Sequence, residues 1–197
     1  MNPLFDTLFA HIEEKVALTD ADKQLLPTYF QCKQLKRKQL LLQEGSLCKY
    51  MGFVAAGLTK SYTTDHKGTE HINQFAWEGW WISDAASFHF GEEAQLSIDA
   101  VEPTSLLLLT KEAYENLLTD IPVMERYFRI LYQNSLATKD QRLASANTHT
   151  AEEKYAFFLQ SYPAISQRIP QNLIASYLGL SPETVSRIKN KANHPNS

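Results

Sequence analysis

Residues 177–191 read YLGLSPETVSRIKNK, and this stretch decides the C-terminal part of the fold. Gly179 follows an apolar segment that ends at Leu178, and Ser181 and Pro182 come soon after it. Serine is a favourable N-cap residue, and proline suits the first position of a helix. Glycine accepts the positive φ that a tight turn between two helices requires. The stretch therefore predicts two short helices joined by a tight turn.

The apolar positions around this turn predict how the two helices pack. Ala175 is small, so it suits a close crossing between the helices, and Leu180, Val185 and Ile188 are placed to close the contact. A helix-turn-helix requires this combination of small, glycine, capping and apolar positions. We therefore interpret residues 170–191 as a helix-turn-helix.

The opposite face of the second helix carries polar and basic side chains. Arginine can donate two hydrogen bonds to guanine, and glutamate can accept one from cytosine N4. Lysines contact phosphates, which fix position rather than sequence. We expect the DNA-contacting residues to be Gln171, Ser181, Pro182, Glu183, Thr184, Ser186, Arg187, Lys189 and Lys191. Asn172, Ser176 and Tyr177 are further candidates for clamping the DNA backbone. The alternative is an ordinary pair of packed helices with a solvated basic face.

The composition restricts which classes of protein remain. The 197 residues carry a net charge of −3, so binding to a nucleic acid would need a local basic surface. Two cysteines, Cys32 and Cys48, are too few for an all-cysteine zinc site or a usual iron–sulfur cluster. The N-terminus lacks the features of a signal peptide, and no apolar run approaches a membrane span. We expect a cytoplasmic protein with reduced cysteines and no membrane partner.

Between residues 32 and 110 the sequence changes to short apolar or alternating runs separated by turn residues. Four glycines recur there at intervals of about a dozen residues: Gly45, Gly57, Gly68 and Gly79. This spacing predicts an antiparallel barrel or sandwich. Ser83–Phe88 interrupts the pattern and is interpreted as one helical turn capped by Ser83.

Helical periodicity and capping residues predict the remaining elements. An amphipathic helix is expected at Leu4–Ala17, and Thr19, Thr110 and Thr150 are expected to cap the helices that follow them. The expected helices after the first are a short one reaching Leu26, Lys111–Leu118, Pro122 to about Ser145, and one from Thr150 through Tyr162. Residues 146–150 break the pattern and are interpreted as a linker.

The long helix carries two stripes of side chains at spacings of three and four. We assign the dimer interface to the first stripe, which contains Met124, Phe128, Leu131, Ser135 and Thr138. The second stripe contains Tyr132, Leu136 and Leu143. One stripe would pack on the barrel and the other would meet a second copy of the chain. The alternative is a single long helix buried against its own barrel.

The segment IPQNLIASYLGLSPETVSRIKNK resembles the C-terminal helix-turn-helix of the Crp/Fnr transcription regulators. A Ser–Arg–Glu–Thr–Val–x–Arg run is typical of that family, and residues 181–187 correspond to it. The resemblance implies that Glu183 and Arg187 read bases. Pro182 replaces the usual arginine, which implies a different DNA site.

Residues 41–81 are similar to the cyclic-nucleotide-binding-like barrel of the same family. The resemblance implies an α+β fold with an N-terminal antiparallel jelly roll, a long dimerisation helix and a C-terminal helix-turn-helix. The expected domains are 1–120 for the sensor, 121–147 for the dimerisation helix and linker, and 148–197 for DNA binding. The implied partners are double-stranded DNA, a second copy of the chain, RNA polymerase and an unknown small-molecule effector.

The residues that bind a cyclic nucleotide in this family are not found at the corresponding positions of this sequence. A Gly–Glu pair is replaced by Ser83 and Asp84, and the position of a later arginine falls near Leu96. An anionic phosphate needs a cation or free N–H groups, so we expect no usual binding of cAMP or cGMP. No cofactor is expected, and residues 1–31 lack the cysteines of the oxygen-sensing branch. Candidate pocket residues are Tyr62, Trp80, Trp81, Ser83, Asp84 and Ser97, unless the two tryptophans fill the space themselves.

Two other classes of protein are alternatives to a DNA-binding regulator. A metal enzyme would use His66, His71 and His89, but their spacing does not match a metal site, so we expect neither a metal nor an enzyme. A sensor or scaffold that acts through protein contacts alone shares every structural feature. A DNA affinity that falls steeply with increasing salt concentration would distinguish a DNA-binding regulator from a sensor or scaffold.

Overall fold

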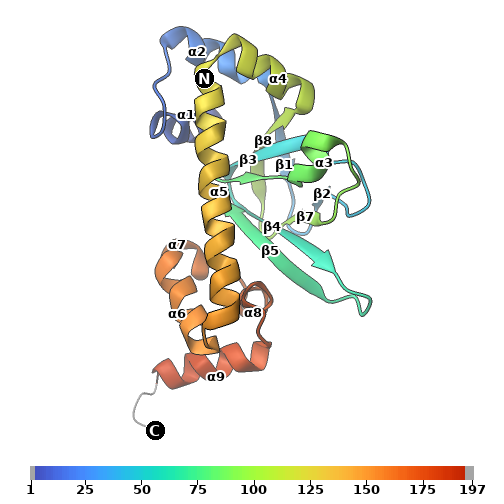
Figure 1. The fold of residues 1–197 in the computed structure, drawn as a ribbon, viewed down its shortest axis with the longest axis vertical. Helices are drawn as coiled ribbons and strands as arrows, with labels where there is room; N and C mark the ends of the chain where they lie inside the picture. Colours follow the sequence, from blue (N-terminus) through green and yellow to red (C-terminus); the bar gives the residue numbers. More distant parts are fainter. Residues whose placement is uncertain (1–2, 194–197) are drawn as a thin grey trace. The chain divides into compact units, whose positions relative to one another are not determined.

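Two four-stranded antiparallel sheets form the centre of the N-terminal part of the chain (Figure 1). The computed structural model describes residues 3–193. The strand orders are β1-β8-β3-β6 and β2-β7-β4-β5. The strands are β1 Phe30–Leu35, β2 Leu40–Leu42, β3 Tyr50–Ala56, β4 Leu58–Thr64, β5 Glu70–Trp77, β6 Trp81–Ile82, β7 Ser97–Ala100 and β8 Thr104–Thr110. This arrangement confirms the predicted antiparallel jelly roll.

The glycines that were predicted to mark turns all have positive φ. The requirement is strictest at Gly57, where φ is +101° and the chain passes from β3 to β4. A Cβ atom built at Gly57 would lie 2.6 Å from the carbonyl oxygen of Pro103, which is too close for any other residue. Glycine is therefore required at this position both by the backbone conformation and by the available space.

The helices flank the sheets and make up the C-terminal part of the chain. They are α1 Leu4–Glu13, α2 Asp20–Leu25, the 3-10 helix η1 Leu26–Tyr29, α3 Ala85–Phe90, α4 Lys111–Asp120, α5 Val123–Thr148, α6 Ala151–Ser161, α7 Pro163–Ser166, α8 Gln171–Leu178 and α9 Pro182–Asn193. Thr19, Thr110 and Thr150 cap α2, α4 and α6 through their side chains, as predicted.

The main differences from the sequence-based expectation concern α3, α1 and α5. Asp84, rather than Ser83, caps α3, because its carboxylate accepts the Ser87 N–H at 3.1 Å. Helix α1 ends at Glu13, four residues before the predicted end. Helix α5 continues to Thr148 through most of the expected linker. The Thr148 hydroxyl donates to the Ala144 carbonyl at 2.9 Å, which helps to satisfy the last turn of α5.

The chain divides into two compact units. One contains the chain up to Thr63 together with Gln74–Asn134, and the other contains Thr64–Asn73 with the chain from Ser135 on. The tip of the β4–β5 hairpin therefore belongs to the same unit as the C-terminal helices. The domain limits expected from the sequence stay a prediction.

The core of the first unit joins the sheets to the helices. Strand β8 contributes Leu106–Leu109, all of which are buried. Helix α1 adds Leu8 and Ile12, and the first turns of α5 add Met124 and Phe128. Fully burying a side chain of this size contributes about 1.5–3 kcal/mol. The N-terminal third of α5 is therefore an integral part of this core.

A polar chain runs through this core from α1 to β6. The Trp81 indole N–H donates to the Tyr127 hydroxyl at 2.8 Å, and that hydroxyl lies 2.8 Å from His11 Nδ1. Because the Tyr127 oxygen accepts the indole hydrogen, its own hydrogen is available for the imidazole nitrogen. Burial lowers the pKa of His11 to about 4. The structure therefore favours a neutral imidazole that accepts a hydrogen bond.

The second unit has a small core of its own. Its buried side chains from α6 to α9 are Tyr155, Phe158, Ile165, Ile169, Ile174, Ala175, Val185 and Ile188. Gly179 ends α8 with φ +68° and ψ +33°. The hydroxyl of Ser181 accepts the Thr184 N–H at 3.1 Å and so caps α9. The predicted turn, its cap and its apolar contacts are confirmed.

We expect protonation of His11 to destabilise the fold below neutral pH. The unfolded chain takes up this proton near the ordinary pKa of 6.5, whereas the folded chain resists it until about 4. The contribution of His11 to the free energy of unfolding is therefore complete above 6.5 and is lost as pH falls toward 4. Urea unfolding at a series of pH values should show a smaller acid-side loss of stability in His11→Gln than in the unmodified chain.

The control variant is His66→Gln, which removes an exposed histidine from the β4–β5 turn. It should leave the pH dependence unchanged. Equal acid-side slopes for His11→Gln and the unmodified protein would contradict the assignment.

Candidate functional site

Helix α9 presents a polar face that is separate from its apolar contact with α8. Val185 is 0% exposed and Ile188 is 7% exposed. The predicted DNA-contacting residues on the other positions are exposed at Ser181, Pro182, Glu183, Ser186, Arg187, Lys189 and Lys191, whereas Thr184 and Gln171 are partly buried. The structure thus brings the predicted residues of α9 to one accessible surface.

The first turn of α9 is held in place by its own side chains. The hydroxyls of Ser181 and Thr184 lie 3.0 Å apart, and Ser181 also accepts the Thr184 N–H. The pKa of the Glu183 carboxyl is lowered, chiefly by a hydrogen bond from its own backbone N–H and then by Ser181. Glu183 therefore remains an ionised acceptor at the start of the helix.

The remainder of α9 has the opposite charge. Arg187, Lys189 and Lys191 follow Glu183 along the helix, and all three are exposed. The chain as a whole carries −3, so this basic end differs from the average surface. An exposed cationic group attracts phosphate with little desolvation cost. The face therefore combines hydrogen-bonding groups at its start with cations further along.

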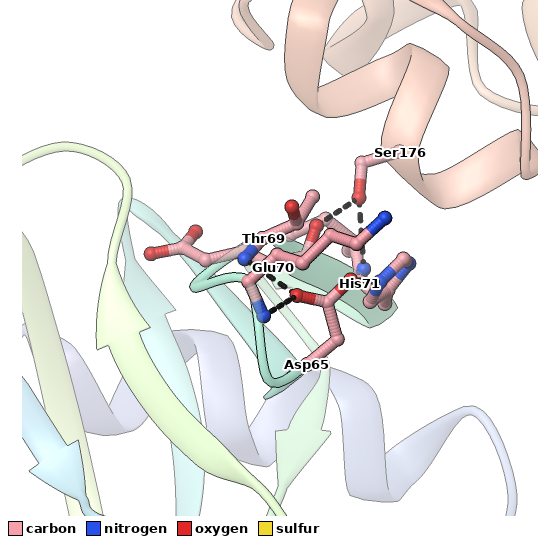
Figure 2. Close-up of polar contacts among 7 residues, drawn as sticks. Asp65, Thr69, Glu70, His71 and Ser176 are labelled. Atoms are coloured by element: carbon pink, nitrogen blue, oxygen red, sulfur yellow. Dashed lines mark hydrogen bonds and ion pairs between the residues drawn. The ribbon is translucent and has the colours of Figure 1, made fainter.

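Ser176, a sequence-based candidate for clamping the DNA backbone, is engaged elsewhere. Its hydroxyl donates to the Glu70 carbonyl at 2.7 Å and accepts the Ile72 N–H at 3.1 Å, as Figure 2 shows. Tyr177 carries the guanidinium of Arg142 over its ring, 4.1 Å from the centroid. Both residues of α8 therefore contact other parts of their own unit.

In the first unit, the candidate pocket residues fall into separate groups. Tyr62 and Ser97 are directly paired across β4 and β7. Asp84 is buried, and its carboxylate accepts the N–H groups of Ser87 and Gln95 at 3.1 and 2.9 Å. Ser83 lies next to it in the chain and is partly buried. Tyr62 and Ser97 therefore lie on the strands, whereas Ser83 and Asp84 lie at the start of α3.

The two tryptophans have different surroundings. The ring of Trp81 packs with those of Phe53 and Phe128, at centroid distances of 5.3 and 5.4 Å. Trp80 stacks on Trp77 with the ring centroids 4.1 Å apart. Trp81 therefore belongs to the contact between β3 and α5.

Sequence reasoning missed a buried ion pair beside Tyr62. Lys60 Nζ lies 3.3 Å from the Asp99 carboxylate, and the two side chains are only 7% and 10% exposed. The ammonium also lies 3.5 Å from the centroid of the Tyr62 ring. The signal in the sequence was a charged residue in each of two strands, but their pairing required the β4–β7 register.

This set of groups does not fit the phosphate of a cyclic nucleotide. The charge of Lys60 is matched by Asp99, and Asp84 adds a buried carboxylate to the same unit. The Ser97 hydroxyl accepts the Glu44 N–H at 3.1 Å. A phosphate placed beside Lys60 would also meet the Asp99 carboxylate, an unfavourable balance in a buried site.

Two of the histidines considered as metal ligands have different polar partners. His71 lies 3.0 Å from the Asp65 carboxylate, and His89 lies 2.7 Å from the Tyr132 hydroxyl. Within residues 3–193 there is no cluster of three or more His, Cys, Asp or Glu side chains that could hold a metal ion. None of the helices in the same range combines the length and hydrophobicity that a membrane crossing demands.

The proposed dimer stripe on α5 is divided between two environments. Met124 and Phe128 are 0% and 2% exposed because they pack into the core of their own unit. Leu131 and Thr138 are partly buried, and Ser135 is exposed. The large exposed apolar side chains of α5 are instead Tyr132, Leu136 and Leu143, which form the second stripe of this helix.

Comparison with known proteins agrees with this architecture. Residues 32–120 match the model of the cyclic nucleotide-binding domain. The chain is 25% identical over 197 residues to the transcriptional activator protein Anr of Pseudomonas protegens, covering 94% of this chain and 77% of the relative. It is 26% identical over 176 residues to the cyclic AMP receptor protein of Thermus thermophilus, covering 87% and 81%.

A solved structure shares the fold over most of the chain. FixK2 from Bradyrhizobium japonicum superposes with a TM-score of 0.72 at 20% identity, covering 84% of this chain and 85% of that one. The chain therefore has the fold of that solved protein, and it resembles regulators of the Crp/Fnr type over most of its length.

Proposed function

We propose that the protein is a sequence-specific DNA-binding regulator of transcription, in which α9 enters the major groove. The observation that carries this proposal is the exposed face of α9, where Glu183 and Arg187 are accessible while Val185 and Ile188 are buried. The similarity to the transcriptional activator protein Anr of Pseudomonas protegens supports the same function.

The proposed roles follow from the position of each side chain on α9. Glu183 and Arg187 lie four residues apart, so they share one face of the helix. Arg187 would donate two hydrogen bonds to a guanine, and the ionised Glu183 would accept one from cytosine N4. Lys189 and Lys191 would contact phosphates. Pro182 cannot form the hydrogen bonds of the arginine that is typical of the family. The base that this arginine would contact must therefore be recognised by other residues.

Arg187→Ala should weaken binding to the selected operator and relax the preference for one base pair. The expected loss is about 1–3 kcal/mol at that base pair, because a bidentate contact with guanine is removed. The operator is first obtained by selecting bound duplexes from random DNA. Binding is then measured by fluorescence anisotropy against that operator and against its single-base variants over a range of salt concentrations.

The matched control is Arg126→Ala, which removes an exposed arginine from α5. It should keep the affinity and the base preference of the unmodified protein. An Arg187→Ala variant with unchanged affinity and preference would refute base reading by Arg187. Failure of the unmodified protein to bind any duplex in a salt-dependent way would favour a regulator that acts through protein contacts alone.

A dimer built on α5 would bring two copies of α9 to one DNA duplex. We propose that Leu136 and Leu143, which are 62% and 66% exposed, meet the same helix of a second copy. Their separation of seven residues is the repeat of a coiled coil. Ser135 and Thr138 would lie beside this contact, whereas Met124 and Phe128 would support it from within the core. Two α9 helices would then occupy half-sites about 34 Å apart.

Leu136→Glu should convert the dimer to a monomer and remove high-affinity binding to a two-half-site operator. Like charges would face each other across the helix pair in place of an apolar contact. Sedimentation velocity over a range of protein concentrations measures the change in mass. The control Gln141→Glu adds the same charge at an exposed position of α5 and should leave the dimer intact. An unmodified protein that is monomeric at all concentrations would contradict the proposal.

The effector of the jelly roll is proposed to be something other than a cyclic nucleotide bound in the usual way. The reason is the set of carboxylates and satisfied hydroxyls around Asp84, Ser97 and Asp99. Tyr62, Ser83, Trp80 and Trp81 remain proposed contacts for an effector of unknown identity. The expectation of contact with RNA polymerase rests on the family resemblance alone.

Calorimetric titration of the full chain with cAMP should therefore show no binding in the micromolar range. The physical reason is that a buried phosphate without a free cation loses the stabilisation of charge-assisted hydrogen bonds. A control titration with cGMP should give the same result. A micromolar dissociation constant for either nucleotide would overturn this expectation.

A further inference from the structure

The tip of the β4–β5 hairpin is attached to the helix-turn-helix by hydrogen bonds. Residues 64–73 and α8 lie in the same compact unit. The contact uses the backbone of β5 and the side chain of Ser176, as Figure 2 shows. Because Ser176 both donates to Glu70 and accepts from Ile72, the position of α8 is specified relative to two residues of one strand.

Arg142 fixes the same contact from a third element. Its guanidinium, at the C-terminal half of α5, donates to the carbonyl of Asn73 on β5 and to the carbonyl of Tyr177 on α8. The guanidinium also lies over the ring of Tyr177, 4.1 Å from its centroid. Burial raises the pKa of Tyr177 to about 12, so the ring stays neutral. Charge-assisted hydrogen bonds and a cation–π contact thus meet at one arginine.

The hairpin tip is itself held in one conformation. The Asp65 carboxylate accepts the N–H groups of Lys67 and Thr69, each at 2.9 Å, and lies 3.0 Å from the His71 ring. The hydrogen bond with His71 is the main reason that the pKa of Asp65 is lowered to about 2. Gly68 supplies the positive φ of the turn. The hairpin therefore offers α8 a preformed strand.

We propose that Arg142 and Ser176 form a clasp that positions the helix-turn-helix on the β4–β5 hairpin. Arg142 and Ser176 are positioning residues in this proposal, which rests on the proposed DNA-binding function. The chain passes between the two compact units in β4, in β5 and in α5. The clasp thus joins α8 to residues 70–73 of β5 and to α5, all within the second unit.

The clasp has a specific consequence for DNA recognition. Without it, α6–α9 are attached to α5 through the short connection at His149 and Thr150. A restrained helix-turn-helix fixes the separation of the two α9 helices in a dimer, and therefore the spacing of the half-sites.

The first experiment tests the clasp without DNA. Native-state amide hydrogen exchange of the full chain is compared between the unmodified protein and Ser176→Ala. Exchange of the Ile72 amide should become about 3- to 10-fold faster, because it loses its hydrogen-bond acceptor. The control is Ser161→Ala, which removes an exposed hydroxyl from α6 of the same unit. An unchanged Ile72 amide in Ser176→Ala would overturn the clasp.

The second experiment measures the spacing of the half-sites. The selected operator is altered by adding or removing one and two base pairs at its centre. The unmodified protein should lose affinity steeply, whereas Ser176→Ala and Arg142→Gln should show a spacing penalty smaller by about tenfold, because their helices reorient more freely. Lys139→Gln removes the same charge from an exposed position of α5 and should keep the full penalty.

The outcomes separate the clasp from the proposed function. Variants that bind the operator with the unmodified spacing penalty overturn the clasp and leave DNA binding intact. An unmodified protein that binds no DNA overturns the proposed function, and hydrogen exchange then decides the clasp alone. Arg142 and Ser176 act on the same contact from different helices, so a variant that fails to fold at one position leaves the other as the test. An effect of only one of two folded variants also counts against a shared clasp.

Discussion

Helix α5 is one continuous helix that is buried in a core at its start and exposes apolar side chains further along. The rest of the structure depends on this constraint. Its first turns bury Met124, Tyr127 and Phe128 in the core of the jelly roll. Its later turns expose Leu136 and Leu143, and carry Arg142. Helical hydrogen bonds keep these two parts in register over 26 residues. The jelly-roll core, the proposed dimer contact and the clasp therefore all use residues of one continuous helix.

Local features of the fold were predictable from the sequence because they depend on neighbouring residues. The caps at Thr110, Thr150 and Ser181 need only a hydroxyl and an N–H three residues further along. The cap of α3 was misplaced by one residue because Ser83 and Asp84 are both good capping residues. In the structure Asp84 accepts the N–H of Gln95, 11 residues further along, as well as that of Ser87.

The polar contacts that sequence reasoning missed all join residues far apart in the chain. Lys60 and Asp99 become neighbours only through the β4–β7 register, and Ser176 reaches Ile72 across 104 positions. Periodicity identifies which face of an element is apolar, but it does not identify the partner of a buried charge or hydroxyl. The exposed face of α9 was predictable because its partner, α8, immediately precedes it in the sequence.

Strand β5 lies at the end of its sheet, next to β4 alone. Such a strand presents unpaired backbone groups, which are a template for association with another chain. The hydroxyl of Ser176 binds the Glu70 carbonyl and the Ile72 N–H, so a helical side chain satisfies two of these groups. The serine proposed to orient the helix-turn-helix thus also covers part of an edge to which another strand could be added.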